Sequence, residues 1–121
     1  NWRLLRALDP YLRASEAARV IVMTSRAGGE IAKPFWGAYA ASKAALEMLA
    51  RTYAEEMRAS ALRVALIDPG AMRTKMRAAA MPGEKADSLP PPEEIAPLIL
   101  KAASRGYDGI AERLKRIQSS A

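Results

Sequence analysis

The apolar positions of this chain alternate between a helical period and short β-branched runs. Leucines at positions 4, 5, 8 and 12 recur at helical spacing, whereas residues 19 to 25 and 62 to 67 are largely apolar runs typical of buried strands. The pattern predicts helices over residues 2–14, 37–58, 71–80, 93–104 and 112–118, and strands over 19–25 and 62–67. Helices that alternate with strands are typical of an α/β fold with a parallel sheet.

Glycine and proline mark the loops between these elements. Residues 28–34 begin with two glycines and end in proline, and residues 81–92 are rich in proline, so we expect loops at both places. Near the C-terminus a strand could start at residues 107–110, but residues 112–118 have the polar pattern of a solvated helix. The segment 105–121 diverges from the rest and receives no functional assignment.

One helix carries a chemically informative pair, Tyr39 and Lys43. Residues four apart lie on one helix face, so the phenol and the ammonium can project side by side. A nearby positive charge favours the phenolate, which makes a proton donor and acceptor without histidine. Among the four tyrosines, only Tyr39 has a lysine four residues later. Taken alone, the spacing is also compatible with a partly buried tyrosine beside a solvated lysine.

The residues that end the two predicted strands indicate that the Tyr39–Lys43 pair belongs to a binding site. Ser25 ends the first predicted strand, and Pro69 and Gly70 end the second. In open α/β sheets, ligands bind outside the carboxyl ends of the strands. We therefore expect Ser25 and the Pro69-Gly70 turn at one sheet edge, with the Tyr39 helix running between them.

Three segments, residues 20–28, 36–46 and 68–74, resemble the short-chain dehydrogenase/reductases. They follow the order found in that family at similar spacings, with one residue more between Ser25 and Tyr39 than in its commonest form. The resemblance extends from the first residue to about Ala103. It implies that residues 1–121 form a single partial domain, the C-terminal part of a doubly wound, Rossmann-like parallel-sheet domain. It also implies an NAD- or NADP-dependent oxidoreductase that transfers hydride between nicotinamide and a small carbonyl or alcohol substrate.

The same resemblance assigns catalytic roles. Tyr39 would be the general acid/base, and Lys43 would acidify it and hold the nicotinamide ribose. Ser25 would donate a hydrogen bond to the substrate oxygen, as an oxyanion-type stabiliser. Thr24 offers a second hydroxyl nearby, but Ser25 is the second hydroxyl residue before the Ala27-Gly28 pair, as the family pattern requires.

Further residues would contact the cofactor. The resemblance places Tyr39 and Lys43 there, makes Pro69 and Gly70 the turn that approaches the nicotinamide, and makes Thr74 the hydroxyl that meets its carboxamide. Pro69-Gly70 could equally be an ordinary strand-ending turn, and Thr74 a helix-start residue. Residues 72–92 correspond to a mobile substrate loop. Its methionines could line an apolar pocket or fill gaps in the core: Met72, Met76 and Met81.

The phosphate-binding half of such a domain is not present in this sequence. No glycine-rich G-x-G-x-x-G turn occurs, so the cofactor type, NAD or NADP, cannot be read. The simplest interpretation is a C-terminal portion of a longer reductase, inactive by itself. The competing interpretation is a non-catalytic fragment that acts as an interaction or dimerisation module. We expect a homo-oligomer, because the helices over 2–14 and 37–58 match the pair that family members use for dimer contacts.

Composition narrows the function classes. The chain has no cysteine and no histidine, which excludes a disulfide framework, a thiolate or histidine metal site and Ser-His-Asp catalysis. No apolar run approaches the ~20 residues that span a membrane. The net charge of +6 comes from scattered arginines, and aromatics make up only 6% of residues, so we do not expect a nucleic-acid partner. A cytoplasmic location is the default expectation.

Overall fold

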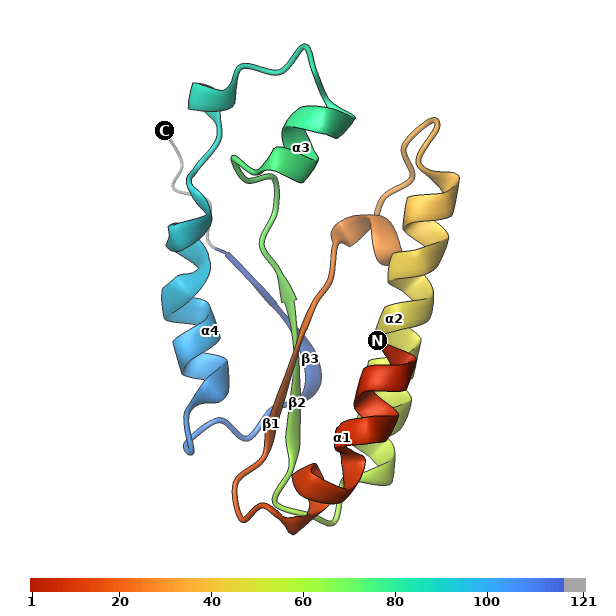
Figure 1. Ribbon diagram of the computed structural model, residues 1–121, viewed down its shortest axis with the longest axis vertical. Helices are drawn as coiled ribbons and strands as arrows, with labels where there is room; N and C mark the ends of the chain where they lie inside the picture. The colour runs from red at the N-terminus through yellow and green to blue at the C-terminus, as the bar shows by residue number, and fades with distance from the viewer. Residues whose placement is uncertain (117–121) are drawn as a thin grey trace.

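A computed structural model describes residues 1–116 as a three-stranded parallel sheet with helices on both faces (Figure 1). The strands are β1 (Arg19–Met23), β2 (Arg63–Asp68) and β3 (Ile110–Lys115), in the spatial order β1-β2-β3. The helices are α1 (Trp2–Ala14), α2 (Gly37–Glu56), α3 (Lys75–Ala80) and α4 (Ala96–Ala103), with 3₁₀ turns η1 (Arg26–Gly28), η2 (Ala86–Ser88) and η3 (Pro92–Ile95). The α/β class predicted from the sequence is confirmed.

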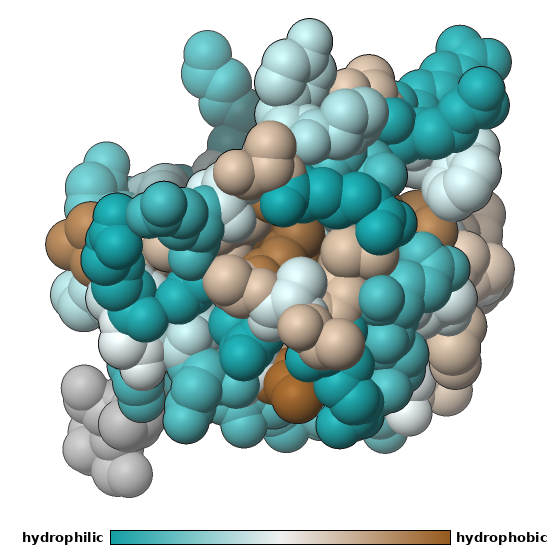
Figure 2. Space-filling model, turned by 90° about the horizontal axis from the view of Figure 1, so that it is seen from below, coloured by the Kyte–Doolittle hydropathy of each residue, from teal (hydrophilic) through white to brown (hydrophobic). Residues whose placement is uncertain are grey.

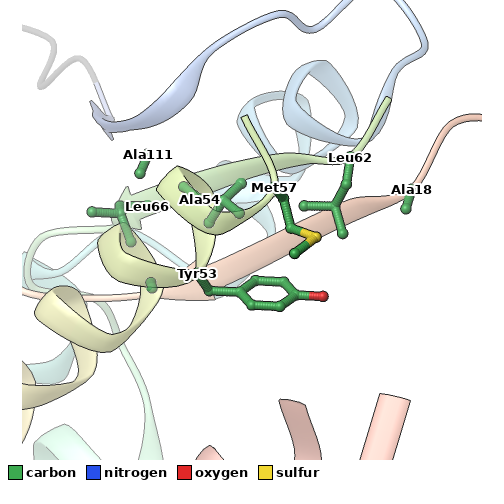
Figure 3. Close-up of a cluster of buried hydrophobic side chains, with 9 residues drawn as sticks. Ala18, Tyr53, Ala54, Met57, Leu62, Leu66 and Ala111 are labelled. Carbon is green, nitrogen blue, oxygen red and sulfur yellow. The ribbon is translucent and has the colours of Figure 1, made fainter. Parts of the chain in front are cut away.

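The central strand β2 supplies both cores through its alternating side chains. Val64 and Leu66 face α2, where they pack against Tyr53 and Met57 in one cluster (Figure 3). Ile67 faces the other way and packs with residues of α4. Because β2 is covered on both faces, almost every position along it is buried, as the continuous apolar run predicted. Full burial of such a side chain stabilises the fold by about 1.5–3 kcal/mol.

The prediction for the C-terminal segment was wrong. Residues 112–118 were expected to be helical, but Ile110–Lys115 is a strand that pairs in parallel with β2. The charged residues of this strand have the sequence pattern of a polar helix face. Their partners, however, lie elsewhere in the chain, since Arg113 pairs with Glu30 and Glu47 and Lys115 pairs with Glu30. Long-range pairing therefore overrides the local pattern. Residues 117–121, which include the end of the expected helix, lie outside the described residues.

The β2–β3 pairing contains one irregularity. Val64 pairs with Ile110, but Leu66 pairs with Arg113, so β3 has one extra residue at this point. Ala111 lies in the bulge with a left-handed φ of 52°. This conformation is uncommon for a residue with a side chain.

The edge of the sheet at which the strands begin presents a mainly hydrophilic surface (Figure 2). Two arginines bind main-chain carbonyls there, Arg19 to Ser104 at 3.0 Å and Arg63 to Ser60 at 2.7 Å. Their guanidinium groups therefore hold loops together. Within residues 1–116, no helix combines the length and the apolar character needed to cross a bilayer.

Helix α1 is attached to α2 by a polar contact at its solvent side. The Tyr53 hydroxyl donates to Asp9 at 2.8 Å, and Asp9 also pairs with Arg13. Burial, followed by the bond to Asp9, raises the pKa of Tyr53 to about 12. The phenol is therefore held in its protonated form in the folded state.

This shift predicts a loss of stability in alkali. The unfolded chain loses the Tyr53 proton near pH ~10, whereas the folded state keeps it until about 12. The stabilisation is thus complete below pH ~10 and falls as the pH rises through the folded pKa. We expect Tyr53→Phe to reduce the difference in free energy of unfolding between pH ~9 and pH ~11, measured by urea titration. Tyr11→Phe, at a 75% exposed position, is the matched control and should leave that difference unchanged.

Candidate active site

The carboxyl ends of β1 and β2 lie together, as the sequence predicted. Met23 pairs with Ile67 at the end of the β1–β2 ladder, and the Thr24 amide continues the ladder by donating to the Ile67 carbonyl at 2.8 Å. Ser25 follows Thr24, and Pro69 follows Asp68, the last residue of β2. One sheet edge therefore carries both segments that were selected from the sequence.

The first turns of α2 bring Tyr39 and Lys43 to this edge. The Lys43 ammonium donates to the main-chain carbonyl of Met23 at 3.0 Å and lies 5.9 Å from the centre of the Tyr39 ring. Trp36 packs edge-on against the same ring at a centroid distance of 5.5 Å. The lysine is therefore held between the tyrosine and the end of β1, instead of extending into solvent.

Two hydroxyls end the β1 segment, and their environments differ. Thr24 is buried, and its hydroxyl donates to the Glu47 carboxylate. Ser25 is half-buried, and its oxygen accepts a hydrogen bond from the Ala27 amide at 3.3 Å, which caps η1. Among the described residues, no hydrogen bond joins the side chains of Ser25 and Tyr39. The Ser25 proton can still be donated outward, whereas the Thr24 proton is committed to Glu47.

A glycine allows this loop to approach α2 closely. A Cβ at Gly28 would lie 3.0 Å from the main-chain carbon of Lys43 and 3.1 Å from the Ala44 nitrogen. The Gly28 amide also closes the turn by donating to the Ser25 carbonyl at 2.9 Å. Gly28 thus sets the separation between the Ser25 loop and the helix that carries Lys43.

The turn after β2 has a defined conformation. Gly70 has φ of 72°, a region that glycine enters without strain, and its amide donates to the Asp68 carboxylate at 3.0 Å. The Pro69 carbonyl accepts from Arg116 at 3.2 Å. The buried Asp68 carboxylate also lies 3.9 Å from Arg26. Several charged groups therefore fix this turn beside the end of β1.

Thr74 begins the short helix α3. Its hydroxyl oxygen accepts from the Arg77 amide at 3.1 Å, so Thr74 is the N-cap of α3. Arg77 pairs with Glu84 at 2.6 Å, and this bond raises the pKa of the guanidinium, with a smaller electrostatic effect from Tyr39. The Arg77–Glu84 pair connects α3 to the loop that follows it.

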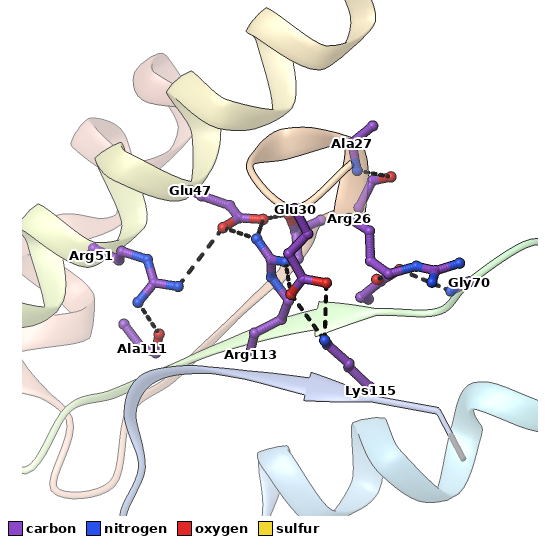
Figure 4. Close-up of polar contacts among 12 residues, drawn as sticks. Arg26, Ala27, Glu30, Glu47, Arg51, Gly70, Ala111, Arg113 and Lys115 are labelled. Atoms are coloured by element: carbon purple, nitrogen blue, oxygen red, sulfur yellow. Dashed lines mark hydrogen bonds and ion pairs between the residues drawn. The ribbon is translucent and has the colours of Figure 1, made fainter. Parts of the chain in front are cut away.

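Sequence reasoning missed a buried polar group beside this site. Arg113 donates to both Glu47 oxygens, at 2.6 and 2.5 Å, and also binds Glu30 (Figure 4). Lys115 pairs with Glu30 at 2.9 Å. Glu47 could have been found, since it continues the Tyr39–Lys43 row by a further four residues. Arg113 could not, because the segment that carries it was assigned to a helix.

Known proteins share the sequence pattern and the fold of this chain. The family model for short chain dehydrogenases matches residues 2–85. The chain belongs to the short-chain dehydrogenase family, as its motifs indicated.

Individual relatives support this assignment. The chain is 44% identical over 100 residues to the oxidoreductase YciK of Escherichia coli K12, a match that covers 83% of this chain and 39% of YciK. The crystal structure of a short chain dehydrogenase from Salmonella enterica serovar Typhi superposes with a TM-score of 0.89 at 34% identity, over 95% of this chain and 47% of that one. The chain therefore spans less than half the length of these relatives.

A cofactor complex is also among the similar structures. The short chain dehydrogenase of Shigella flexneri 2a, crystallised in complex with NADP, has a TM-score of 0.88 and 35% identity, over 95% of this chain and 48% of that one. The match extends over most of β3 as well, because it covers 95% of this chain.

The close approach at Gly28 leads to a prediction. Gly28→Ala places a methyl group against the α2 main chain, which cannot move aside as a flexible side chain could. We expect a loss of about 1–3 kcal/mol in the free energy of unfolding, typical of overpacking. Gly37→Ala is the control, since a Cβ there meets nothing within 4 Å. It should be neutral or stabilise by about 0.4–1 kcal/mol. Equal effects of the two substitutions in urea titrations would contradict the role given to Gly28.

Proposed function

We propose that this chain forms the catalytic half of an NAD(P)-dependent oxidoreductase that transfers hydride between nicotinamide and a carbonyl or alcohol substrate, with Tyr39 as general acid/base. The observation that carries the proposal is the placement of Lys43. Its ammonium lies beside the Tyr39 ring and against the carbonyl of Met23, which is two residues before Ser25. Membership of the short-chain dehydrogenase family supports the same reaction class.

The donors at this edge suit a nicotinamide nucleoside. An ammonium has three N–H groups, and the Met23 carbonyl accepts one of them, so Lys43 can donate to ribose hydroxyls. The left-handed turn at Gly70 has no side chain to obstruct an approaching ring. The Thr74 hydroxyl accepts from the Arg77 amide and still has its own proton to donate, which fits a carboxamide oxygen. When bound, the nicotinamide would supply the hydride.

The remaining chemistry is a proton transfer. During reduction, Tyr39 would donate its phenolic proton to the alkoxide oxygen that develops on the substrate. The Lys43 charge would stabilise the phenolate that remains. Ser25 would donate a hydrogen bond to the same substrate oxygen and stabilise its developing charge. In the direction of oxidation, Tyr39 would accept the alcohol proton.

Cofactor affinity would depend on a second segment. The pyrophosphate of a dinucleotide is normally bound by a glycine-rich turn at a helix N-terminus, and this sequence contains no G-x-G-x-x-G turn. Together with the coverage of less than half of its relatives, this supports a longer protein in which another segment binds the phosphates. The chain by itself would then be inactive and bind NADPH weakly.

The role of Tyr39 can be tested in the full-length protein. Tyr39→Phe removes one hydroxyl and keeps the ring against Trp36. We expect turnover, measured as NADPH oxidation with a panel of carbonyl compounds that includes benzaldehyde, to fall at least ~100-fold with little change in NADPH affinity. Lys43→Ala should reduce both the turnover and the affinity for NADPH. Tyr11→Phe, at an exposed position on α1, should leave both unchanged.

Two outcomes would argue against the proposal. Near wild-type turnover in Tyr39→Phe would show that this tyrosine is only a packed helix residue. NADPH binding at micromolar concentration by the isolated 121-residue chain, followed by fluorescence, would contradict the need for a separate phosphate-binding segment.

We also propose that α1 and α2 form a contact between two copies of the protein. The small residues Ala41 and Ala45 and the 64%-exposed Met48 form a row along α2 that does not face the sheet. The dimerisation module considered as an alternative function would use the same surface. We expect light scattering to find a dimer or larger assembly of the full-length protein, and Ala45→Glu to dissociate it by burying a charge in the contact. A strict monomer at high concentration would refute the contact.

A further inference from the structure

A buried ion pair lies one helical turn beyond Lys43. Glu47 is 5% exposed, and the side chain of Arg113 is 10% exposed. The Arg113 Nη2 donates to both Glu47 oxygens at 2.6 and 2.5 Å, and the Thr24 hydroxyl donates to the same carboxylate. The pair joins α2 to β3 and to the end of β1 at one point.

Each contact of this cluster is adjacent to a residue of the proposed site. Thr24 precedes Ser25 directly after the end of β1, and Glu47 follows Lys43 by one turn of α2. The loop that contains Glu30 follows Gly28, and Arg113 binds Glu30 with its other terminal nitrogen (Figure 4). The cluster therefore connects the segments that carry the serine and the lysine without including either residue.

The bulge in β3 determines that Arg113 faces α2. Leu66 packs in the α2-side cluster, and its pairing with Arg113 directs both side chains to that face. Without the extra residue, Glu112 would occupy this position and bring a second carboxylate toward Glu47. The bulge requires Ala111 in the left-handed region, and Arg51 binds its carbonyl at 3.1 Å. The left-handed region is unfavourable for a residue that has a Cβ atom.

Stability alone does not explain the ion pair. Burial opposes the charge on Arg113, but the hydrogen bonds and charges of Glu47 and Glu30 outweigh it and raise the pKa of the guanidinium. The Arg113 Nε is buried without an acceptor among residues 1–116. A buried ion pair of this kind often stabilises a protein no more than apolar residues of the same volume. Its directional bonds, however, fix the relative positions of the segments that they join.

We propose that Glu47, Arg113 and Thr24 are positioning residues that hold the Lys43 turn of α2 at a fixed distance from the Ser25 end of β1. The inference rests on the proposed oxidoreductase function, because Lys43 and Ser25 take their roles from it. Displacement of a reacting group by about 1 Å can reduce turnover about 100-fold. The cluster thus maintains the geometry of the site from outside it.

The first test removes both charges together in the full-length protein. Glu47→Gln combined with Arg113→Met leaves no unpaired buried charge, so we expect a folded protein with a thermal midpoint close to that of the wild type. With benzaldehyde as probe and NADPH as reductant, kcat should fall at least ~10-fold while the KM for benzaldehyde changes less than ~3-fold. In a crystal structure, the 3.0 Å bond between Lys43 and the Met23 carbonyl should open. Glu55→Gln with Arg58→Met, an exposed pair near the end of α2, is the control and should change none of these.

The second test changes only one hydroxyl. Thr24→Val keeps the shape of the side chain and removes its bond to Glu47, whereas Thr24→Ser keeps the hydroxyl. We expect kcat to fall about tenfold in the valine variant, because the Lys43 turn is displaced from Ser25, and to stay within about twofold in the serine variant. A purely structural role for Thr24 would affect stability without this separation in kcat.

The outcomes separate this inference from the proposed function. A folded charge-removed variant that keeps either wild-type kcat or the 3.0 Å contact overturns the positioning role. If Tyr39→Phe retains full turnover, the proposed function fails. The Lys43–Met23 distance in the variant with Glu47→Gln and Arg113→Met then decides alone whether the cluster positions Lys43.

Discussion

The parallel pairing of β1 with β2 is the interaction on which the candidate site depends. It brings Ser25 and the Pro69-Gly70 turn to the same sheet edge, although they lie far apart in sequence. Helix α2 then crosses this edge at a distance that Gly28 sets, since a Cβ at that position would meet the helix main chain at 3.0 Å. Strand pairing and one close backbone contact together define where Lys43 can lie.

Most of the fold and the proposed site could be predicted from local patterns. The strands β1 and β2 are apolar runs covered on both faces, and the spacing of Tyr39 and Lys43 is a property of the helix itself. The prediction failed for β3. Its charged residues are neutralised by Glu30 and Glu47, which precede the strand by 60 residues or more along the chain. A local window contains the charges of β3 but not their partners.

The environment of Thr24 could not be predicted from the sequence either, because its partner Glu47 lies far away along the chain. Period-two alternation along β1 places Thr24 on the face of Val20 and Val22, toward α2, and that face contains Glu47. From the sequence, Thr24 was only a second hydroxyl beside Ser25. The structure distinguishes the two by their surroundings, since one is buried against a carboxylate and the other lies at the mouth of the sheet.

The spatial order of the strands has a further consequence. β1 is at the border of the sheet in the described part of the chain and pairs with β2 on one side only. Its Val20-Ile21-Val22 run therefore presents apolar side chains together with a row of main-chain donors and acceptors that β2 does not use. Such a border is a template for any extended segment that reaches it, including the same run in another copy. In the described part of the chain, the free side of β1 is therefore the place where another strand can extend the sheet.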